Sequence, residues 1–323
     1  MEAPRHLRCL GYPVLLSPSG EPIRFRTKKH LALLVYLAVE YHQTHRRDHL
    51  AEFLWPGVPL PEARHSLATG LSVLRPRVGP GVVQANRDHV AFAPHRVLLD
   101  LDRLFNNDNS NDLASCDFEI AGFLEGFEIP DCRDFSLWKD RVQARVIPRL
   151  TATFRQCVDR CRRHGDTRRI EQLANRMLGL DELCEDAVRA KMEVFALTGD
   201  RFAALRLYEE WRLKIDEELS AKPSEEMAAI AIQLRKRGWE RAPIADLPNP
   251  SFDQRRSKAF VGRSTEYKAL YEAWESLRQR QRAHVMVLGD SGVGKTTLVD
   301  RFTAAAGFEG AAVSRVQCYD LDR

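Results

Sequence analysis

The feature that most constrains this chain is a phosphate-binding pattern close to its C-terminal end, G-x-x-x-x-G-K-[ST]. The glycines of this pattern let backbone N–H groups turn toward phosphate, Lys295 can reach the β- and γ-phosphates, and the Thr296 hydroxyl can ligate Mg²⁺. The apolar run 284–288 predicts a buried strand before the loop, and the residues from Thr297 onward predict a helix after it. We therefore expect ATP or ADP and Mg²⁺ to bind at Gly289, Asp290, Ser291, Gly292, Val293, Gly294, Lys295, Thr296 and Thr297.

The position of the loop limits what it can do. Only 26 of the 323 residues follow Thr297, too few to complete a nucleotide-binding domain. Hydrolysis also needs an acidic residue on a later strand. Asp320 and Asp322 come after a predicted second strand, 311–318, without the apolar run that normally precedes such a residue. We expect no ATP turnover from this chain and assign no catalytic residues. We therefore expect that the chain is a fragment or that a longer protein continues beyond Arg323.

The first hundred residues predict strands, three helices and a β-hairpin, in that order. Short strands are expected within 6–25, and the apolar spacing predicts helices over 27–40, 46–55 and 61–75, with Thr27 as an N-cap. A turn at 86–88 between two short apolar runs predicts the hairpin. This order is that of a winged helix-turn-helix, whose third helix enters the DNA major groove.

The third helix is the candidate DNA-reading element. Its apolar residues recur at intervals of four, four and three, which predicts one buried face and leaves the polar residues outside. Arginine can bond guanine, and Ser or Thr can bond bases or phosphates. The alternative is a plain solvated helix face. The predicted DNA-binding residues on this helix are Arg64, His65, Thr69, Ser72 and Arg75, and the predicted phosphate contacts are Lys28, Lys29, Arg46, Arg47 and Arg87.

Charge is unevenly distributed along the chain. Residues 1–100 carry 13 Lys and Arg against 8 Asp and Glu, a net +5, together with eight of the ten histidines. Residues 101–134 carry 2 Arg against 9 acidic residues, a net −7. The first block suits an anionic partner and the second repels one.

A long helical stretch follows. Helices are predicted over 135–164, 166–179, 182–198, 201–219 and 223–237, separated by glycine- or proline-containing breaks. Asp166 and Asp200 lie 34 residues apart, the period of a tetratricopeptide-type helical hairpin. No nucleophile–base pair or carboxylate dyad is evident, so we expect a packed core with a surface for a protein partner or a second copy.

Three motifs of the first block together resemble a known family. They are Lys28-Lys29-x-Leu31-x-Leu33-Leu34, Arg47-Asp48-x-Leu50-Ala51-x-x-Leu54-Trp55-Pro56 and Ala63-Arg64-x-Ser66-Leu67-x-x-x-Leu71-Ser72-x-Leu74-Arg75, followed by the strand Arg96–Asp102. The set resembles the DNA-binding domain of the SARP-type bacterial transcriptional activators, which is similar to the output domains of some response regulators. The helical stretch, with Gly122-Phe123-Leu124-Glu125-Gly126-Phe127 before it, resembles the bacterial transcriptional activation domain of the same family.

A second resemblance covers residues 260–323. Phe260-Val261-Gly262-Arg263-x-x-Glu266, shortly before the phosphate loop, resembles the start of signal-transducing AAA-type ATPase modules. In that family the box lies near the adenine, so the resemblance implies that Gly262 and Arg263 contribute to nucleotide binding.

Together these patterns predict a multidomain, mostly α chain with α+β parts. The expected domains are a winged-helix DNA-binding domain at 1–102, a tetratricopeptide-like activation domain at 103–237, a linker at 238–258 and a truncated P-loop α/β segment at 259–323. We expect a transcriptional activator that binds double-stranded promoter DNA, contacts RNA polymerase or a second copy through its helical domain, and is switched by ATP. The alternative is an ATP-dependent signalling switch whose N-terminal domains bind protein.

Other patterns bear on location and metal content. No run approaches the about 18 apolar residues of a membrane span, and the N-terminus does not have the form of a signal peptide. Seven scattered cysteines suggest reduced thiols, and we expect a cytoplasmic protein. Cys157 and Cys161 could share a helix face, and the spacing of His42, His45 and His49 could suit a metal. We favour core thiols and solvated or capping histidines instead.

Overall fold

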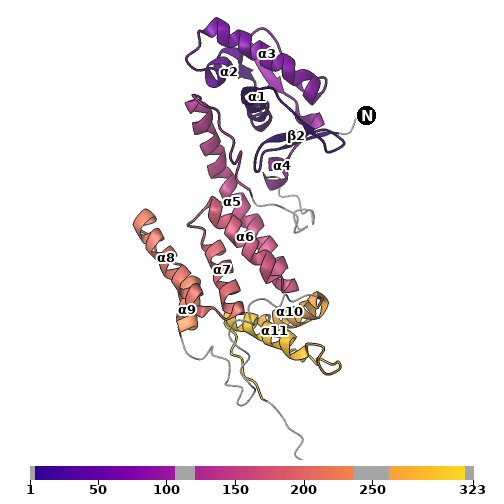
Figure 1. Ribbon diagram of the computed structural model, residues 1–323, viewed down its shortest axis with the longest axis vertical. Helices are drawn as coiled ribbons and strands as arrows, with labels where there is room; N and C mark the ends of the chain where they lie inside the picture. Colours follow the sequence, from indigo (N-terminus) through magenta and orange to yellow (C-terminus); the bar gives the residue numbers. More distant parts are fainter. Residues whose placement is uncertain (1–3, 106–120, 236–261, 317–323) are drawn as a thin grey trace, which may run out of the picture. The chain divides into compact units, whose positions relative to one another are not determined.

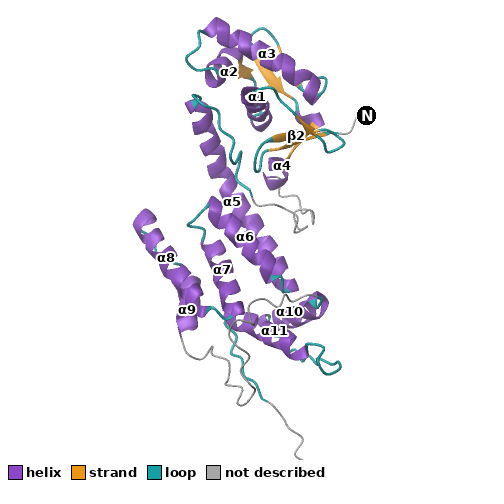
Figure 2. Cartoon of the chain, in the orientation of Figure 1, coloured by secondary structure: helices purple, strands orange, loops and turns teal. Residues whose placement is uncertain are grey.

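The computed structural model describes residues 4–105, 121–235 and 262–316. The chain forms two compact units, Met1–Thr153 and Phe154–Arg323. Helices predominate in both, and strands are confined to the first within the described ranges (Figures 1 and 2). The expected linker at 238–258 lies outside the described residues.

A small mixed sheet begins the first unit. Strands β1 (Arg5–Arg8), β2 (Val14–Leu16) and β3 (Pro22–Ile23) are antiparallel, and β7 (Val97–Leu99) pairs in parallel with β1. Leu7 and Leu15 are paired across β1 and β2 and are fully buried, so alternate side chains of these short strands enter the core. The Asp100 carboxylate accepts hydrogen bonds from the backbone N–H groups of Cys9 and Leu10, which satisfies the backbone just beyond β1.

Three helices pack beside this sheet. They are α1 (Lys28–Val39), α2 (Arg47–Leu54) and α3 (Leu60–Val78), as the apolar spacing predicts. The Thr27 hydroxyl accepts a hydrogen bond from the N–H of His30, which confirms the expected N-cap. Gly70 of α3 lies against α1, where an added Cβ would be 3.1 Å from the Leu33 side chain. The absence of a side chain there lets the two helices approach closely.

The predicted hairpin is present and has a third strand that the sequence did not indicate. Strands β5 (Val83–Ala85) and β6 (His89–Phe92) are antiparallel, and β4 (His45–Arg46), just before α2, pairs with β6. The Asn86 side chain accepts hydrogen bonds from the N–H groups of Asp88 and His89, which fixes the tight turn. The start of α2 is thereby fastened to the hairpin.

Two boundaries in this unit differ from those expected. The strand predicted for 96–102 ends at Leu99, and a short helix α4 (Asp100–Phe105) follows a 3₁₀ turn η1 (Pro94–Arg96) and β7. Asp100 is bonded to the backbone after β1, which turns the chain out of the sheet. Helix α3 continues past Pro76 to Val78, whose side chain is fully buried, whereas Pro76 is exposed.

Residues 121–153, which the sequence assigns to the helical domain, belong to the first compact unit. Leu10 and Phe123 form a β-bridge, and the indole N–H of Trp138 donates to the Glu40 carboxylate at 2.9 Å. Trp138 is almost fully buried, and its ring centroid lies 5.0 Å from that of Tyr36 in α1. Trp138 therefore packs in the core of the first unit.

The second unit contains most of the predicted helical stretch. Its helices pack consecutively through apolar faces that include Met177, Met192, Trp211 and Met227. The Asp166 and Asp200 carboxylates cap two of them, accepting from the N–H groups three residues on. The helices are the end of α5 (Arg133–His164), then α6 (Thr167–Leu180), α7 (Glu185–Thr198), α8 (Arg201–Leu219) and α9 (Glu225–Arg235).

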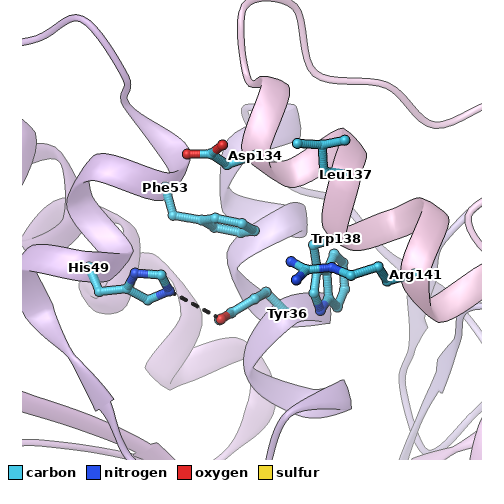
Figure 3. A pocket seen from close by; sticks show the side chains of 7 residues that line it. All are labelled: Tyr36, His49, Phe53, Asp134, Leu137, Trp138 and Arg141. Atoms are coloured by element: carbon cyan, nitrogen blue, oxygen red, sulfur yellow. Dashed lines mark hydrogen bonds between the residues drawn. The ribbon is translucent and has the colours of Figure 1, made fainter.

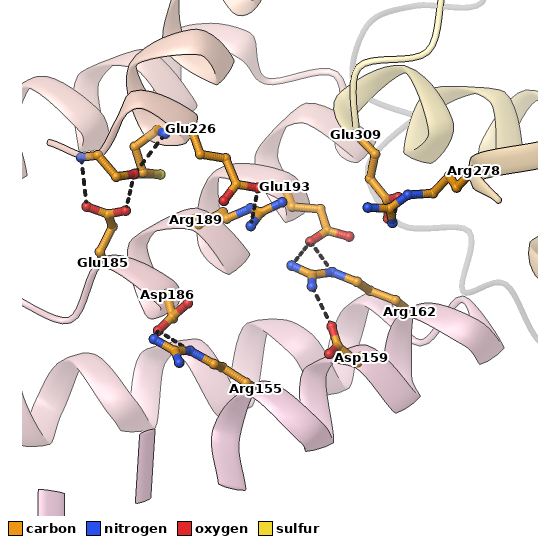
Figure 4. A network of polar contacts seen from close by, with 12 residues as sticks. Arg155, Asp159, Arg162, Glu185, Asp186, Arg189, Glu193, Glu226, Arg278 and Glu309 are labelled. Carbon is orange, nitrogen blue, oxygen red and sulfur yellow. Dashed lines mark hydrogen bonds and ion pairs between the residues drawn. The ribbon is translucent and has the colours of Figure 1, made fainter. Parts of the chain in front are cut away.

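Ion pairs join these helices on their polar sides (Figure 4). Arg162 of α5 bonds Glu193 of α7 at 2.7 Å, and the Glu193 side chain is almost completely buried. Burial opposes the charge on Arg162, but Glu193 and Asp159 outweigh it and raise its pKa. Because removing one partner would leave a buried charge alone, this pair holds α5 and α7 in one arrangement.

The last described segment contains two helices, α10 (Ser264–Arg278) and α11 (Lys295–Phe308), and no strand. The prediction of a buried strand at 284–288 is wrong, because this run is unpaired and Met286 and Leu288 are 80% exposed. Residues 311–316 of the predicted second strand are unpaired too, and 317–323 lie outside the described residues. A strand forms only with a partner for its backbone, and no described segment supplies one here.

None of the helices in the described ranges combines the length and the apolar character that crossing a bilayer requires.

Candidate functional site

The polar face predicted for α3 is exposed. Ala63, Leu67, Leu71 and Leu74 are at most 2% exposed and form its buried side. Because residues three or four apart share a helix face, the polar side chains between them point outward. All five predicted DNA-binding residues of α3 are exposed: Arg64, His65, Thr69, Ser72 and Arg75.

Arg64 has a carboxylate partner that the sequence did not indicate. It forms an ion pair with Asp48, in the first turn of α2. The hydrogen bond from Arg64 lowers the Asp48 pKa, so the pair favours the ionised carboxylate. A shallow cavity of about 430 Å³ surrounds this pair and is lined by Arg46, Asp48, Arg64, Asp88 and His89. The starts of α2 and α3 and the hairpin turn therefore meet at one mixed-charge surface.

The other predicted phosphate contacts are spread over the first unit. Arg47 is hydrogen-bonded to the hairpin. Its guanidinium donates to the Asn86 carbonyl, and its backbone N–H donates to the Asp88 carbonyl. Arg87 lies exposed in the hairpin turn. Lys28 donates to the carbonyl of Glu128 at 3.4 Å, and the Lys29 ammonium lies 5.7 Å from the centre of the Trp55 ring. Arg46 thus joins Arg64 at the cavity, whereas the two lysines contact other parts of the unit.

The histidines and cysteines considered as metal ligands have other surroundings. His45 is buried and bonds the Glu40 carbonyl at 3.2 Å, whereas His42 is exposed. His49 lies 3.4 Å from the Tyr36 hydroxyl, at a cavity of about 360 Å³ beside Phe53 and Trp138 (Figure 3). Cys157 and Cys161 are buried in α5. In the described part of the chain no three His, Cys, Asp or Glu side chains gather as a metal site.

The phosphate-binding pattern forms a loop that ends at the first residue of α11. Gly292 and Gly294 have φ of +84° and +90°, in the left-handed region that glycine tolerates best. An added Cβ at either position would meet nothing within 4 Å, so the backbone here is open. The Lys295 ammonium donates to the carbonyls of Gly289 and Asp290, both at 2.7 Å. These hydrogen bonds hold the start of the loop close to the Lys295 side chain.

The rest of the expected nucleotide site is partly described. Arg263 donates to the carbonyl of Val293 at 3.0 Å and pairs with Glu266, so the Gly262–Arg263 box reaches the loop. Thr296 and Thr297 are exposed in the first turn of α11. Open glycine backbone, a lysine over the loop and a hydroxyl at a helix N-terminus fit a nucleotide with Mg²⁺. Phe260, Val261, Asp320 and Asp322 lie outside the described residues.

Two features of these sites could not be found by pattern. The pairing of Asp48 with Arg64 depends on how α2 and α3 cross. Arg301 of α11 donates hydrogen bonds to Gly165 and Thr167, where α5 ends and α6 begins. Arg301 and Thr167 are 134 residues apart in the sequence. No local motif marks either contact.

Comparisons with known proteins agree with this organisation. Residues 125–235 match the bacterial transcriptional activator domain family, and residues 259–323 match the AAA ATPase domain family. Among solved structures, Mycobacterium tuberculosis EmbR in complex with a low-affinity phosphopeptide is similar to this chain. The TM-score is 0.52 and the identity 16%, over 87% of this chain and 73% of that one. At that identity the likeness concerns the fold. No functionally curated protein gives a significant match.

The two family matches fall where the sequence resemblance placed an activation domain and the start of an ATPase module. Residues 125–235 are thus similar to the bacterial transcriptional activator domain and residues 259–323 to the AAA ATPase domain, a combination consistent with a SARP-type activator.

Proposed function

We propose that this chain is a DNA-binding transcriptional activator whose first unit is a winged helix. The observation that carries the proposal is the exposed polar face of α3, which lies beside the start of α2 and the hairpin turn. In a winged helix these are the elements that meet DNA. Residues 125–235 match the bacterial transcriptional activator domain family. A domain of that family beside a DNA-binding domain is what a transcriptional activator would contain.

The side chains divide into two roles. Arg64, Thr69, Ser72 and Arg75 project from the α3 face that would enter the major groove, where Arg can bond guanine and hydroxyls can bond bases or phosphates. Arg46, beside them, and Arg87, in the hairpin, would bind the phosphate backbone and set the salt dependence. The lysines at the start of α1 and His65 would add weaker contacts. Asp48 keeps Arg64 in place until a base or phosphate competes for it.

The ATPase segment would bind ATP or ADP with Mg²⁺ as a switch. Backbone N–H groups of the loop would hold the phosphates, Lys295 would exchange its two carbonyl partners for phosphate oxygens, and Thr296 would ligate Mg²⁺. The Gly262–Arg263 box would lie near the base. Bound nucleotide supplies negative charge that orders the loop, and we expect no turnover from these residues.

The helical domain would supply the protein contacts. Its consecutive helix pairs and the 34-residue spacing of its two aspartate caps support a tetratricopeptide-like domain, an architecture that presents surfaces to other proteins. The expected partners are RNA polymerase or a second copy bound at a neighbouring DNA repeat. Such a protein works in the cytoplasm.

DNA binding is tested by selecting bound fragments from a genomic library and titrating the winner across a salt series. Arg64→Ala should weaken specific binding by about 1–3 kcal/mol. Thr69→Ala should weaken specific binding by a smaller amount. Arg103→Ala is the matched control, since Arg103 is an exposed arginine of α4, which Figure 1 shows at the other end of the unit from α3. Absence of salt-sensitive, sequence-dependent binding would refute the proposal and favour a signalling switch whose first unit binds protein.

Nucleotide binding is tested separately by titrating Mg-ATP into the chain. Lys295→Ala should abolish measurable binding, because the variant lacks the ammonium that reaches the phosphates. Lys268→Ala, at an exposed lysine of α10, should bind as the wild type does. Equal affinities for all three proteins would refute the role of Lys295.

A further inference from the structure

The helix that begins at the phosphate loop does not stand alone. Its first turn carries Lys295 and Thr296, and its later turns are bonded to the helices of the activator domain, within the second compact unit. No motif predicted these contacts, and the nucleotide-binding role does not require them.

The first contact is polar. The Arg301 guanidinium donates to the carbonyl of Gly165 at 2.9 Å and to the hydroxyl of Thr167 at 2.6 Å. Gly165 lies in the turn between α5 and α6, and Thr167 is the first residue of α6. A cation at the C-terminal end of α5 also complements the negative end of that helix. Arg301 therefore stabilises the turn electrostatically as well as by hydrogen bonds.

The second contact is at the far end of α11. Phe308 is 3% exposed and belongs to the apolar core that α7, α8 and α9 form around Met192, Tyr208 and Ile230. The Gln233 amide of α9 donates to the carbonyl of Gly307 at 2.8 Å, which satisfies part of the C-terminal end of α11. An aromatic ring inserted into the core of another domain is a strong anchor.

Helix α10 supports the same arrangement. Tyr267 is 2% exposed, and its ring would lie only 3.1 Å from a Cβ added at Gly165. Glu309, just after α11, accepts hydrogen bonds from Trp274 at 3.0 Å and Arg278 at 3.2 Å, both on α10. The two helices thus form one block, and that block abuts the turn at Gly165.

We propose that α11 couples the nucleotide site to the activator domain, with Arg301 on the α5–α6 turn and Phe308 in the α7–α9 core as the coupling contacts. The inference rests on the proposed nucleotide binding and names the route by which it reaches the activator domain. A helix transmits displacement along its axis, and Arg301 lies only about 9 Å along α11 from Lys295 at 1.5 Å per residue. A bound nucleotide that orders the first turn of α11 would therefore strengthen the contacts of its later turns with the activator domain.

Coupling of this kind is reciprocal. If bound nucleotide favours the docked arrangement by some factor, loss of docking lowers nucleotide affinity by the same factor. A substitution in the activator domain, at the docking turn, should therefore weaken binding at the phosphate loop. A contact that only adds stability would leave the affinity of the folded protein unchanged.

The decisive experiment measures the affinity of the full chain for Mg-ATPγS. Thr167→Val removes the hydroxyl that Arg301 bonds, and it should weaken binding severalfold, as should Arg301→Gln. Thr198→Val is the matched control, since the Thr198 hydroxyl donates to the carbonyls of Val194 and Phe195 in its own helix α7. Circular dichroism establishes that each variant is folded. Hydrogen exchange of the turn at 165–167 should slow severalfold when nucleotide binds the wild type, and not in Arg301→Gln.

The outcomes separate the coupling from the proposed function. Wild-type affinity in Thr167→Val, an equal loss in Thr198→Val, or unchanged exchange at the turn would overturn the coupling, while loss of binding in Lys295→Ala would still support the nucleotide site. If the wild type binds no Mg-ATPγS, the nucleotide switch and the coupling both fail, and DNA binding is judged by its own titration. Should Arg301→Gln not fold, Thr167→Val decides the matter.

Discussion

The first unit and the ATPase segment contain similar short apolar runs with opposite outcomes. In the first unit, β1 has a hydrogen-bonded neighbour on each side, and Leu7 and Leu15 are completely buried. In the ATPase segment, the run 284–288 has no partner, and Met286 and Leu288 lie 80% exposed, while α10 and α11 on either side are formed. A helix satisfies its own backbone, whereas a strand depends on another part of the chain.

This difference divides the chain by where its stability resides. Buried apolar side chains in the first unit contribute both transfer free energy and packing, and exposed ones in the ATPase segment contribute neither. The helices α10 and α11 pack on each other around Tyr267, Leu270, Tyr271 and Leu298, and they gain further stability through their contacts with the activator domain. Substitutions placed in the two regions can test that division.

The largest effect is expected from paired leucine substitutions. Leu34 of α1 is completely buried, and Leu34→Ala should lower the free energy of unfolding by about 2–5 kcal/mol, because it leaves a cavity. Leu288→Ala makes the same chemical change at an 80% exposed site and should change it by less than about 0.5 kcal/mol. Urea denaturation measures both. Similar losses would show that Leu288 is packed in solution and that the contrast between the two leucines is wrong.

The next effect concerns two glycines that follow helices. Gly165 and Gly199 both have positive φ, +69° and +85°, so Ala at either should cost about 1 kcal/mol in backbone strain. Only at Gly165 does an added Cβ meet another side chain, the Tyr267 ring of α10. Gly165→Ala should therefore cost an additional 1–3 kcal/mol, roughly the overpacking penalty.

Thermal unfolding of the two glycine variants gives the comparison, and Tyr267→Ala supplies the cross-check. In a Tyr267→Ala background the two glycine substitutions should cost the same, since only backbone strain remains. A difference that persists without the tyrosine ring would contradict the packing of α10 on the α5–α6 turn.

The local patterns foresaw most of the helices and little of what joins them. Apolar spacing and the Thr27 cap located α1–α3, and glycine-containing breaks located α6–α8, because these signals act over a few residues. The exposed face of α3 followed from its periodicity alone. Strand β4 is two residues long and exists only through its pairing with β6, so no run marks it. The Asp48–Arg64 pair and the Arg301 contact depend on tertiary packing in the same way.

The smallest expected effect is a pH dependence confined to the first unit. Burial lowers the pKa of His45, although the Glu40 carbonyl and carboxylate partly offset it, and burial together with Arg77 lowers that of His30. A depressed pKa in the folded state means that stability is full above the ordinary value of about 6.5 and is lost as pH falls through the folded value. The free energy of unfolding should therefore decrease between about pH 7 and pH 5.

His45→Gln should flatten this decrease, because one of the two groups that must take up a proton on unfolding is gone. His89→Gln is the control, since the His89 side chain is exposed, whereas that of His45 is buried. Urea midpoints across the pH series, followed through a signal from the first unit, give the slopes. An equal slope in His45→Gln and the wild type would mean that burial of His45 does not set the acid sensitivity. The decrease in the free energy of unfolding of the first unit at acid pH would then have to come from groups other than His45.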